Sequence, residues 1–329
     1  MLERNPDMPS LTDSLKIDDI LTLPDRVILA PMQGVMSPGF VCAAVETGIA
    51  GTRMTPFFSV GANSIPSGRA LRRALKVWAG HESGPLIVQL AGCHADSLAE
   101  TSCRLIENGY PYINLNFGCP SRQVMSSGHG GACLKDPALM VKLIHAIHER
   151  CGGAVSLSVK MRTGYESPDE MENLAAALRD TAVRLFILHF RTVKENYQPV
   201  ENPLPRLARF RELMPDRILI GNGDILSPED AERMMEVCGC DGIALARGVT
   251  KDPFLIQRIL RKNGGETTDR DRYQFLYRIF SSSASGSNWK RNGFLENVRM
   301  TFGADSKEFR HFITLSKEEM AEELEQKLS

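Results

Sequence analysis

Several residues of this chain are of types that could do chemistry, and they follow short apolar stretches. Cys119 lies in a Gly-Cys-Pro turn, three residues after Asn116. Pro120 fixes the backbone φ angle and Gly118 permits a tight bend, so the turn would display the thiol. A lone cysteine is more often a small buried apolar residue, and an asparagine beside a turn is a common turn former. Their place after an apolar stretch nevertheless makes both residues candidates for a site.

Other apolar stretches of the chain end in glutamine, asparagine, histidine or cationic residues. A strand end that served structure alone would not need such a set of polar groups. Glycine in a loop lets backbone N–H groups approach an anion, and an arginine beside it can bind phosphate oxygens in pairs. A surface salt bridge is the alternative explanation for such an arginine. The residues concerned are Gln89, Lys160, Arg162, His189, Arg191, Asn222, Gly223, Arg247 and Gly248.

The elements that would position these residues are strands that alternate with helices. Apolar stretches rich in β-branched residues predict strands at 27–30, 49–54, 86–91, 112–116, 155–160, 185–190, 218–222 and 242–246. Amphipathic segments predict helices at 97–108, 137–151, 169–181 and 228–237, the last with Ser227 as N-cap. The spacing of about 31 residues is that of one βα unit, which predicts an α/β fold, the (β/α)8 TIM barrel. A doubly wound sheet is the alternative, but no GxGxxG motif lies at a strand-to-helix turn.

The loops after the seventh and eighth strands of a TIM barrel commonly bind phosphate, and its active site lies at the carboxyl ends of the strands. In this chain those loops contain Gly223, Arg247 and Gly248. Gln89 and Lys160 could hydrogen-bond the polar edge of a flat heterocycle. The set therefore predicts a phosphorylated cofactor such as FMN.

The chain divides into three segments by its pattern. Residues 1–24 are an N-terminal extension, residues 25–255 the cofactor-binding TIM barrel, and residues 256–329 a small C-terminal helical domain, because the strand pattern stops after Gly248. Within the last segment, residues 281–287 (SSSASGS) are expected to form a low-complexity loop. Residues 317–329 are expected to form a Glu-rich helix or a frayed tail with a solvated face.

The overall charge excludes a uniform polycation. Lys and Arg total 39 and Asp and Glu total 40, a net charge of −1, yet residues 251–316 hold 12 basic and 7 acidic residues. No apolar run approaches the roughly 18 residues that a membrane span needs. The first twenty residues fit neither a secretory signal nor a transit peptide. We therefore expect a cytoplasmic protein with no membrane partner.

The cysteines and histidines of the sequence do not indicate a metal site. Eight cysteines scattered among apolar neighbours are expected to be reduced and mostly buried. No CxxC occurs, and Cys238 and Cys240 form a lone CxC. His145 and His148 are three residues apart on a predicted helix but have no third ligand at matching spacing.

A series of motifs between residues 28 and 255 reads, in chain order, APMQGV, INLNFGCPSRQV, GHGGACLKDP, SVKMRTG, LHFRT, IGNGDI and GCDGIALARG. Together they resemble the motifs of the tRNA-dihydrouridine synthases. The GCPS string followed by a Gly-rich stretch and LKDP separates this family from dihydroorotate dehydrogenase-like barrels, which share the fold and FMN. The resemblance implies an FMN-dependent oxidoreductase that uses NADPH and reduces the C5–C6 bond of specific uridines in tRNA.

The resemblance also implies roles for residues of this chain. Cys119 would be the general acid that protonates uracil C5 while hydride arrives at C6, and a thiol with an ordinary pKa of about 8.5 is a usable proton donor at pH 7. Asn116 and Arg162 would face the uracil. The flavin ring and ribityl chain would contact Pro31, Met32, Gln89 and Lys160. The ribityl phosphate would lie among His189, Asn222, Gly223, Arg247 and Gly248.

The implied tRNA substrate adds expectations for the surface. A uridine in folded tRNA has to leave its stack to reach a flavin, so the barrel mouth should be open and cationic. Candidates for this rim are Arg191, Lys194, Arg206, Arg209 and Arg211, with a solvated helix face as the alternative. A second basic group is Arg69, Arg72, Arg73 and Lys76 on a predicted helix. By the same resemblance, the C-terminal helical domain, residues 256–329, would bind the tRNA. A monomer fits the family.

Two departures from the family pattern stand out. Many members have an acidic residue after the Thr that ends strand two, where this chain reads Met-Thr-Pro-Phe-Phe at residues 54–58. Phe190 replaces the glycine of the common HGRT motif, and a ring that pointed into the mouth would narrow the flavin pocket. Two other functions stay open at this point: an FMN-dependent barrel oxidoreductase acting on a small molecule, and a family member that binds flavin or RNA without turnover.

Overall fold

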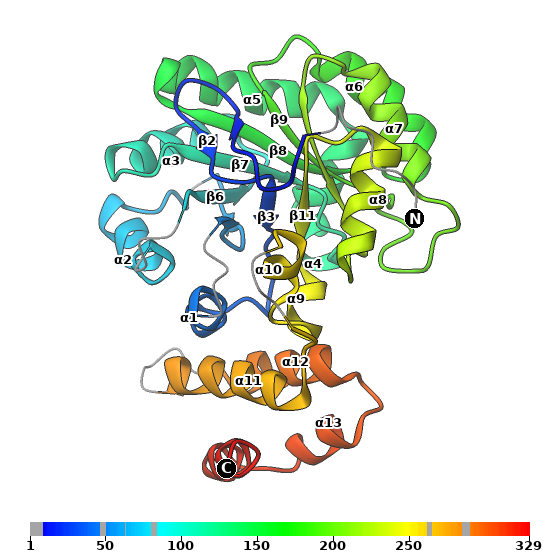
Figure 1. Ribbon diagram of the computed structural model, residues 1–329. Helices are drawn as coiled ribbons and strands as arrows, with labels where there is room; N and C mark the ends of the chain where they lie inside the picture. The colour runs from blue at the N-terminus through cyan, green and yellow to red at the C-terminus, as the bar shows by residue number, and fades with distance from the viewer. Residues whose placement is uncertain (1–8, 47–50, 63, 80–83, 262–264, 285–289) are drawn as a thin grey trace.

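The computed structural model describes residues 9–46, 51–62, 64–79, 84–261, 265–284 and 290–329, and its centre is a closed barrel of parallel strands (Figure 1). The barrel strands are β3 (Val27–Leu29), β4 (Thr52–Met54), β6 (Leu86–Ala91), β7 (Tyr112–Phe117), β8 (Ser156–Arg162), β9 (Leu185–His189), β10 (Ile218–Asn222) and β11 (Gly242–Leu245). β3 pairs with both β11 and β4, and β4 pairs with β6, so the sheet closes on itself. The predicted TIM barrel is confirmed; of the predicted strand at 49–54, residues 49 and 50 lie outside the described residues.

The side chains that point into the barrel change character along the strands. Ile87, Ile187 and Ile220 belong to one buried apolar cluster in the barrel interior. Because side chains alternate between the two faces of a strand, the next inward position lies two residues further on. There the chain has polar residues instead, namely Gln89, His189 and Asn222. The interior is therefore apolar toward the amino ends of the strands and polar at their carboxyl ends.

A hairpin that the sequence pattern did not reveal closes the amino-terminal end of the barrel. It consists of β1 (Leu15–Lys16) and β2 (Thr22–Leu23), which pair antiparallel. Leu15 and Leu23 join the same apolar cluster as the inward residues of the barrel. Asp18 in the hairpin accepts a hydrogen bond of 2.6 Å from Ser156 Oγ at the start of β8. The N-terminal extension thus acts as a plug.

Helices surround the barrel and connect its strands (Figure 1). Three predicted helices are found within two residues of their expected ends, as α3 (Ala95–Glu107), α5 (Pro137–Cys151) and α8 (Pro228–Cys238). Ser227 caps α8 as expected, since its side chain accepts from Asp230 N at 3.2 Å. The helix predicted at 169–181 is shorter, because it begins as the 3-10 turn η3 (Pro168–Glu170) and continues as α6 (Met171–Leu178). The remaining helices of the barrel are α1 (Pro38–Glu46), α2 (Gly68–Ala79), α4 (Arg122–Ser126), α7 (Leu204–Leu213), α9 (Arg247–Lys251) and α10 (Leu255–Ile259).

The C-terminal helices lie beyond the carboxyl end of the barrel (Figure 1). They are α11 (Asp269–Ala284), α12 (Arg291–Phe302), α13 (Lys307–Phe312) and α14 (Lys317–Gln326). α11 packs on α1, where Phe275 meets Phe40 edge to face at 5.3 Å. Asn297 of α12 donates from Nδ2 to the Val35 carbonyl at 3.1 Å. The helical segment is therefore docked against the loop and helix that follow the first barrel strand.

One expectation for this helical segment was wrong. Residues 281–284 are not loop but the last turn of α11, whose aromatic and apolar face is buried and outweighs the weak helix preference of serine; residues 285–287 lie outside the described residues. The tail forms the expected Glu-rich helix, α14, with a solvated face that carries Glu318, Glu319, Glu322 and Glu325. Its other face is packed, since Met320 and Leu324 are buried against α11. Among the described helices, none is long and apolar enough to span a membrane.

Candidate active site

The candidate residues lie at one end of the barrel because the carboxyl ends of its parallel strands meet there. Gln89, Asn116, Lys160, Arg162, His189 and Asn222 are on the strands themselves. The others follow directly after strands: Pro31 and Met32 after β3, Cys119 after β7, Arg191 after β9, Gly223 after β10, and Arg247 and Gly248 after β11. The fold therefore gathers at one end of the barrel the residues that the sequence analysis selected as candidates. Their roles stay predictions.

A chain of side-chain hydrogen bonds fixes the turn that carries Cys119. Asn116 Oδ1 accepts from the backbone N–H of Gly118 at 3.1 Å and of Cys119 at 3.0 Å. Asn116 Nδ2 donates to Gln89 Oε1 at 2.8 Å, and Gln89 Nε2 donates to Asn114 Oδ1 at 2.8 Å. These side chains are almost fully buried. Asn116 thus holds the turn in place and couples it to the neighbouring strand.

The Gly-rich stretch GHGG packs directly beneath the same turn. Gly131 N donates to the Cys119 carbonyl at 2.9 Å. Gly130 has a φ of +65°, and a Cβ there would lie 2.7 Å from Val124 Cγ1 and 3.2 Å from Cys119 Cβ. A larger residue at this position would displace the turn that bears the thiol. This close approach explains why the two glycines follow the GCPS string.

The Cys119 thiol is half-buried and stays protonated at neutral pH. Burial raises its pKa above the ordinary value, against smaller opposing effects of the Ser121 backbone and of the cations Arg162 and Lys160. A thiol that held its proton only weakly would be a thiolate at pH 7 and could not donate a proton. The surroundings of Cys119 therefore suit a general acid.

Lys160 is a buried cation in the centre of the mouth. Its ammonium group donates to Asn222 Oδ1 at 3.0 Å, and Asn222 Nδ2 donates to the Ala244 carbonyl at 2.7 Å. Burial, together with repulsion from Arg162, lowers the pKa of Lys160 to about 8. A buried ammonium group with a single acceptor among the described residues has capacity to bind a further acceptor.

His189 is a neutral ring beside these cations. Burial first, and then the positive charges of Arg162, Lys160, Arg191 and Arg247, lower its pKa well below the ordinary value. Its Nδ1 accepts from the backbone N–H of Arg191 at 3.2 Å. The hydrogen of the neutral ring is therefore assigned to Nε2, which leaves one N–H donor at the mouth.

Arg162 fastens two loops of the mouth through peptide carbonyls. Its Nε donates to Gly118 O at 2.9 Å, and its Nη1 donates to Thr192 O and Asn196 O at 2.7 Å each. The loop that follows β9 is thereby tied to the turn that precedes Cys119. Arg162 is 3% exposed, and these hydrogen bonds give it a structural role. The substrate contact expected of it stays a prediction.

Asp224 is a functional candidate that the sequence analysis missed. It lies between Arg191 and Arg247 and forms ion pairs with both guanidinium groups. Burial raises the pKa of Asp224, but the two arginines outweigh it and the net shift is downward. Its place directly after Gly223 in the IGNGDI motif was the available signal. Arg191 itself is 3% exposed and lies beneath the surface, so it does not form part of an exposed cationic rim.

The Phe190 ring does not project into the barrel mouth, so it does not narrow the mouth in the way considered from the sequence. The ring is 3% exposed and packs beneath Gly223, where an added Cβ would come within 2.3 Å of Phe190 Cε1. Gly223 has a φ of +133°, a backbone conformation that other residues rarely adopt. Gly223 and Phe190 are thus a matched pair. Gly248 is likewise required by packing, since a Cβ there would lie 2.4 Å from Ile225 O.

Tyr197 is a second residue that the sequence analysis missed. It is 56% exposed, in the loop after β9, and both Arg162 and Arg247 lie 5.4 Å from its ring centroid. The loop is held on either side of it, because Asn196 O accepts from Arg162 and Gln198 O accepts from Arg191 Nε at 2.6 Å. An exposed aromatic ring is thus held in place at the barrel mouth.

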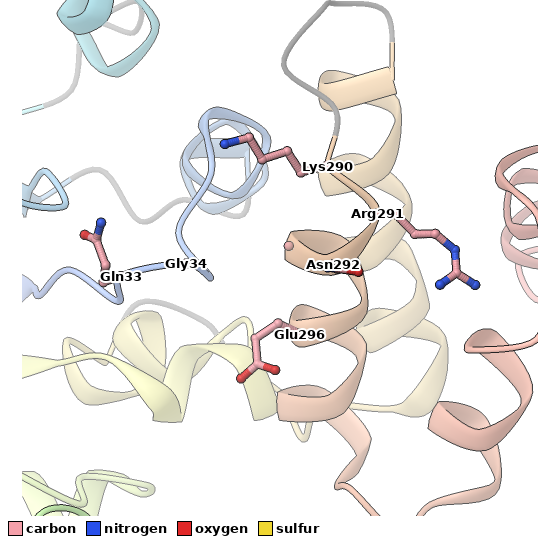
Figure 2. A pocket seen from close by; sticks show the side chains of 7 residues that line it. Gln33, Gly34, Lys290, Arg291, Asn292 and Glu296 are labelled. Carbon is pink, nitrogen blue, oxygen red and sulfur yellow. The ribbon is translucent and has the colours of Figure 1, made fainter. Parts of the chain in front are cut away.

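An open cleft of about 680 Å³ lies between the barrel and the C-terminal helices (Figure 2). One side is the loop after β3, with Gln33 and Gly34, and the other is the first turn of α12, with Lys290 and Asn292. Figure 2 shows the Lys290 side chain extending across toward the α1 side of the cleft. Glu296, the acidic residue of the cleft, is paired with Arg299. The cleft therefore opens beside the mouth with a cationic side chain in it.

The basic groups named from the sequence differ in what they contact. Arg206, Arg209 and Arg211 pair with Glu195, with Glu172 and Glu212, and with Asp241. Arg69, Arg72, Arg73 and Lys76 are exposed on α2, and within the described part of the chain no carboxylate pairs with them. Among the basic groups named from the sequence, the stripe on α2 is therefore the one whose side chains have no carboxylate partner within the described residues. Within that same part of the chain, no three His, Cys, Asp or Glu side chains are arranged to hold a metal.

The mouth as a whole fits an anionic, flat ligand. Arg191 and Arg247 both pair with the carboxylate of Asp224, and the Lys160 ammonium group binds Asn222 nearby in the chain. Arg191 Nη1 is buried with no hydrogen-bond partner among the described residues. Burying such a donor without a partner is costly, so an acceptor belongs there. An unpaired donor beside the cationic Arg247 is suited to an anionic acceptor such as a phosphate.

The sequence motifs and this geometry agree with the family comparison. The family model for dihydrouridine synthase (Dus) matches residues 28–283, more than half of the chain. This chain belongs to the dihydrouridine synthase family. The resemblance drawn from the motifs is thereby confirmed. The family consists of flavin-dependent oxidoreductases that act on uridine, and the chain is one of them.

Two similar proteins are named tRNA-dihydrouridine(16) synthase. The protein of Pseudomonas syringae pv. tomato is 30% identical over 244 residues, which cover 73% of this chain and 76% of that protein. The protein of Yersinia pestis is 31% identical over 241 residues, which cover 72% and 77%. Among solved structures, an old yellow enzyme from Trypanosoma cruzi superposes with a TM-score of 0.57 at 10% identity, covering 82% of this chain and 96% of that one. The last similarity shows the shared barrel fold alone.

Proposed function

We propose that this protein is a tRNA-dihydrouridine synthase that reduces the C5–C6 double bond of a uridine, with FMN as its flavin and NADPH as the reductant. The observation that carries the proposal is the neutral Cys119 thiol, held by Asn116 at the polar end of a barrel whose mouth fits a phosphorylated flavin. The family membership agrees with it.

The chain's own residues account for binding and proton transfer. Reduced flavin, when bound, supplies a hydride for uracil C6. Cys119 Sγ gives its proton to C5, so one hydride and one proton saturate the bond. Lys160 and Gln89 would hold the flavin ring and ribityl chain through their N–H donors, and Pro31 and Met32 would line it. The terminal phosphate would lie among His189, Asn222, Gly223, Arg247 and Gly248, with Asp224 orienting Arg247.

The substrate contacts follow from the same arrangement. Asn116 and Arg162 lie next to the turn that carries Cys119, where the uracil edge has to come. A uridine that leaves its stack places the base at the mouth and the flanking backbone over the surface around it. The cleft beside α12 and the basic stripe on α2 are where phosphates of tRNA would lie. The protein would act as a monomer in the cytoplasm.

The names of the relatives make position 16 the proposed site of reduction in tRNA. The direct experiment incubates the purified protein with FMN, NADPH and a full tRNA lacking dihydrouridine, and then locates dihydrouridine by mass spectrometry of nuclease fragments. We expect dihydrouridine at position 16. Reduction at another position would overturn the assignment of the position and keep the activity. No dihydrouridine with a flavin-loaded protein would overturn the proposed function.

Binding of tRNA should weaken steeply as salt rises. Phosphate contacts release counterions, so affinity falls linearly with salt on a logarithmic scale, with roughly 0.7–0.9 units of slope per contact. We expect roughly a tenfold or larger loss of affinity between 50 and 200 mM salt, measured by fluorescence anisotropy.

A matched pair of variants locates these contacts. Replacing Arg69, Arg72, Arg73 and Lys76 together by glutamine should lower the salt slope, since these side chains are exposed and unpaired among the described residues. Arg209→Gln should leave the slope unchanged, because Arg209 is already paired with Glu172 and Glu212. An unchanged slope in the fourfold variant would remove α2 from the tRNA surface.

Flavin affinity should depend on pH through Lys160. The pKa of Lys160 is about 8, so the ammonium group is charged at pH 7 and loses its proton as the pH rises toward 9. A hydrogen bond from a charged donor stabilises by about 1.5–3 kcal/mol, so the dissociation constant for FMN should rise about tenfold over this range. Quenching of flavin fluorescence measures it.

Lys160→Met provides the control for this pH dependence. The variant lacks the titrating donor, so it should bind FMN weakly at pH 7 and show a flat profile up to pH 9. A wild-type profile that is flat over the same range, or a methionine variant with the same slope, would contradict the role of Lys160.

Tyr197 should act as a stacking surface for a base of the tRNA. Its ring is exposed and held between Arg162 and Arg247, and stacking of a base on an aromatic side chain is worth about 1–3 kcal/mol. Tyr197→Ala should raise KM for tRNA about tenfold with FMN content unchanged. Tyr197→Phe keeps the ring and should retain the wild-type KM; a phenylalanine variant as weak as alanine would assign the effect to the hydroxyl instead.

A further inference from the structure

We propose that Cys103 and Cys151 are a modification site, at which hydrogen peroxide joins helices α3 and α5 by a reversible disulfide. The two sulfur atoms are 3.2 Å apart although the residues are 48 apart in the chain. Cys103 is in α3 and Cys151 is the last residue of α5, and the two helices pack against each other on the outside of the barrel. Neither residue has a part in the proposed reduction of uridine.

The exposure of the two thiols sets this pair apart from another pair of neighbouring cysteines, Cys238 and Cys240. Cys103 and Cys151 are both half-buried, so a small oxidant can reach them. Cys238 and Cys240 are also neighbours, but they are only 1% and 4% exposed. Oxidation of a thiol requires access as well as a nearby partner. The fold thus offers an accessible pair and an inaccessible pair in one molecule.

The groups around the pair indicate which of the two thiols reacts with the oxidant first. Glu100 and, to a smaller degree, Cys103 raise the pKa of Arg150, so a cation stays beside the Cys103 sulfur. Burial and the neighbouring Cys103 raise the pKa of Cys151 to about 12. The cation beside Cys103 favours that sulfur as the one that meets the oxidant first, and Cys151 as the thiol that then closes the link.

The chemistry balances with peroxide as the oxidant. The Cys103 sulfur attacks one peroxide oxygen, the O–O bond breaks, and the leaving hydroxide takes the thiol proton to form water, which leaves Cys103 as a sulfenic acid. The Cys151 sulfur then attacks the Cys103 sulfur, the S–O bond breaks, and a second water leaves with the Cys151 proton. Two thiols lose two electrons to one peroxide, which becomes two waters.

The cross-link would act on the elements behind the active site and would not occupy the mouth. α3 leads into β7, which carries Asn116, and α5 leads into β8, which carries Lys160. A bond between the two helices restricts the unfolded chain over the 48 residues that separate them. The oxidised protein should therefore melt at a higher temperature, by about 5 °C for a chain of this size.

The test treats the full-length, reduced protein with hydrogen peroxide, alkylates the remaining thiols with iodoacetamide, and maps the peptides without reductant. We expect one linked species containing Cys103 and Cys151, two hydrogens lighter than the separate peptides, which dithiothreitol reverses. The melting temperature should rise with the link, and Cys103→Ser and Cys151→Ser should each abolish both effects.

Two results would overturn the proposal. One is a wild-type protein in which Cys103 and Cys151 still take up iodoacetamide after treatment, or are recovered only as separate sulfinic acids. The other is a link between Cys238 and Cys240 in the folded protein in place of the expected one, because that would remove access as the deciding factor. The wild-type mapping decides the matter even where a serine variant fails to fold.

Discussion

Cys119→Ala should lose uridine reduction while keeping its flavin. The thiol is the proposed proton donor to uracil C5, and general acid catalysis contributes typically about 10²–10⁴-fold to a rate. We expect the rate of flavin reoxidation by tRNA to fall by about that factor in a single-turnover experiment. The flavin absorbance of the variant should match that of the wild type, since Cys119 holds no part of the phosphate or ribityl groups.

Cys93→Ala is the matched control for this variant. Cys93 is also half-buried and follows the neighbouring strand β6, but its sulfur contacts the Ser127 carbonyl at 3.5 Å rather than the turn at Asn116. Its reoxidation rate should equal that of the wild type. A Cys119→Ala protein with the wild-type rate would mean that the proton comes from another group, and an equal loss in Cys93→Ala would mean that the effect is structural.

Phe190→Ala should cause the largest loss of stability among the substitutions considered. The ring is 3% exposed and fills the space beneath Gly223, beside His189 at 5.2 Å between ring centroids. Truncating a buried phenylalanine leaves a cavity and costs about 3–5 kcal/mol. We expect the melting temperature to fall by roughly 6 °C or more, and flavin affinity to fall with it, because Gly223 loses the ring that fixes its position.

Tyr197→Ala is the aromatic control for this measurement. Its ring is 56% exposed, and its loss removes little buried area, so the melting temperature should change by less than about 2 °C. A Phe190→Ala protein that melts with the wild type would show that the ring is not part of the packing under the phosphate site.

The fold could be predicted from the sequence because the barrel strands carry a strong local signal. Strands buried on both faces are continuous apolar runs, and β6 and β10 have the bounds that the pattern gave. The plug made of β1 and β2 could not be predicted, since each strand has two residues and is stabilised by contact with the barrel interior. Residues 281–284 were missed because tertiary packing outweighed the composition of the serine run.

The candidate site could be predicted only in part, for a similar reason. Residues on strands were found because the end of a strand fixes where they lie. Asn114 was missed although it lies two residues before Asn116 and therefore faces the same side of β7. Asp224 and Tyr197 lie in loops, where the partners that place them come from other strands: Arg191 and Arg247 for Asp224, and Arg162 for Tyr197. Such long-range contacts leave no local pattern.

The plug closes the amino-terminal end of the barrel. With Leu15 and Leu23 packed into the barrel interior, the part of the chain that the structure describes leaves the carboxyl end, which faces the C-terminal helices, as the way to the thiol. Under the proposed function, the nicotinamide reductant and the uridine would therefore both enter at this end of the barrel. We expect reduction of the flavin by the nicotinamide and reduction of the uridine to alternate, because one substrate bound at the opening would exclude the other. An excess of either substrate should therefore slow turnover.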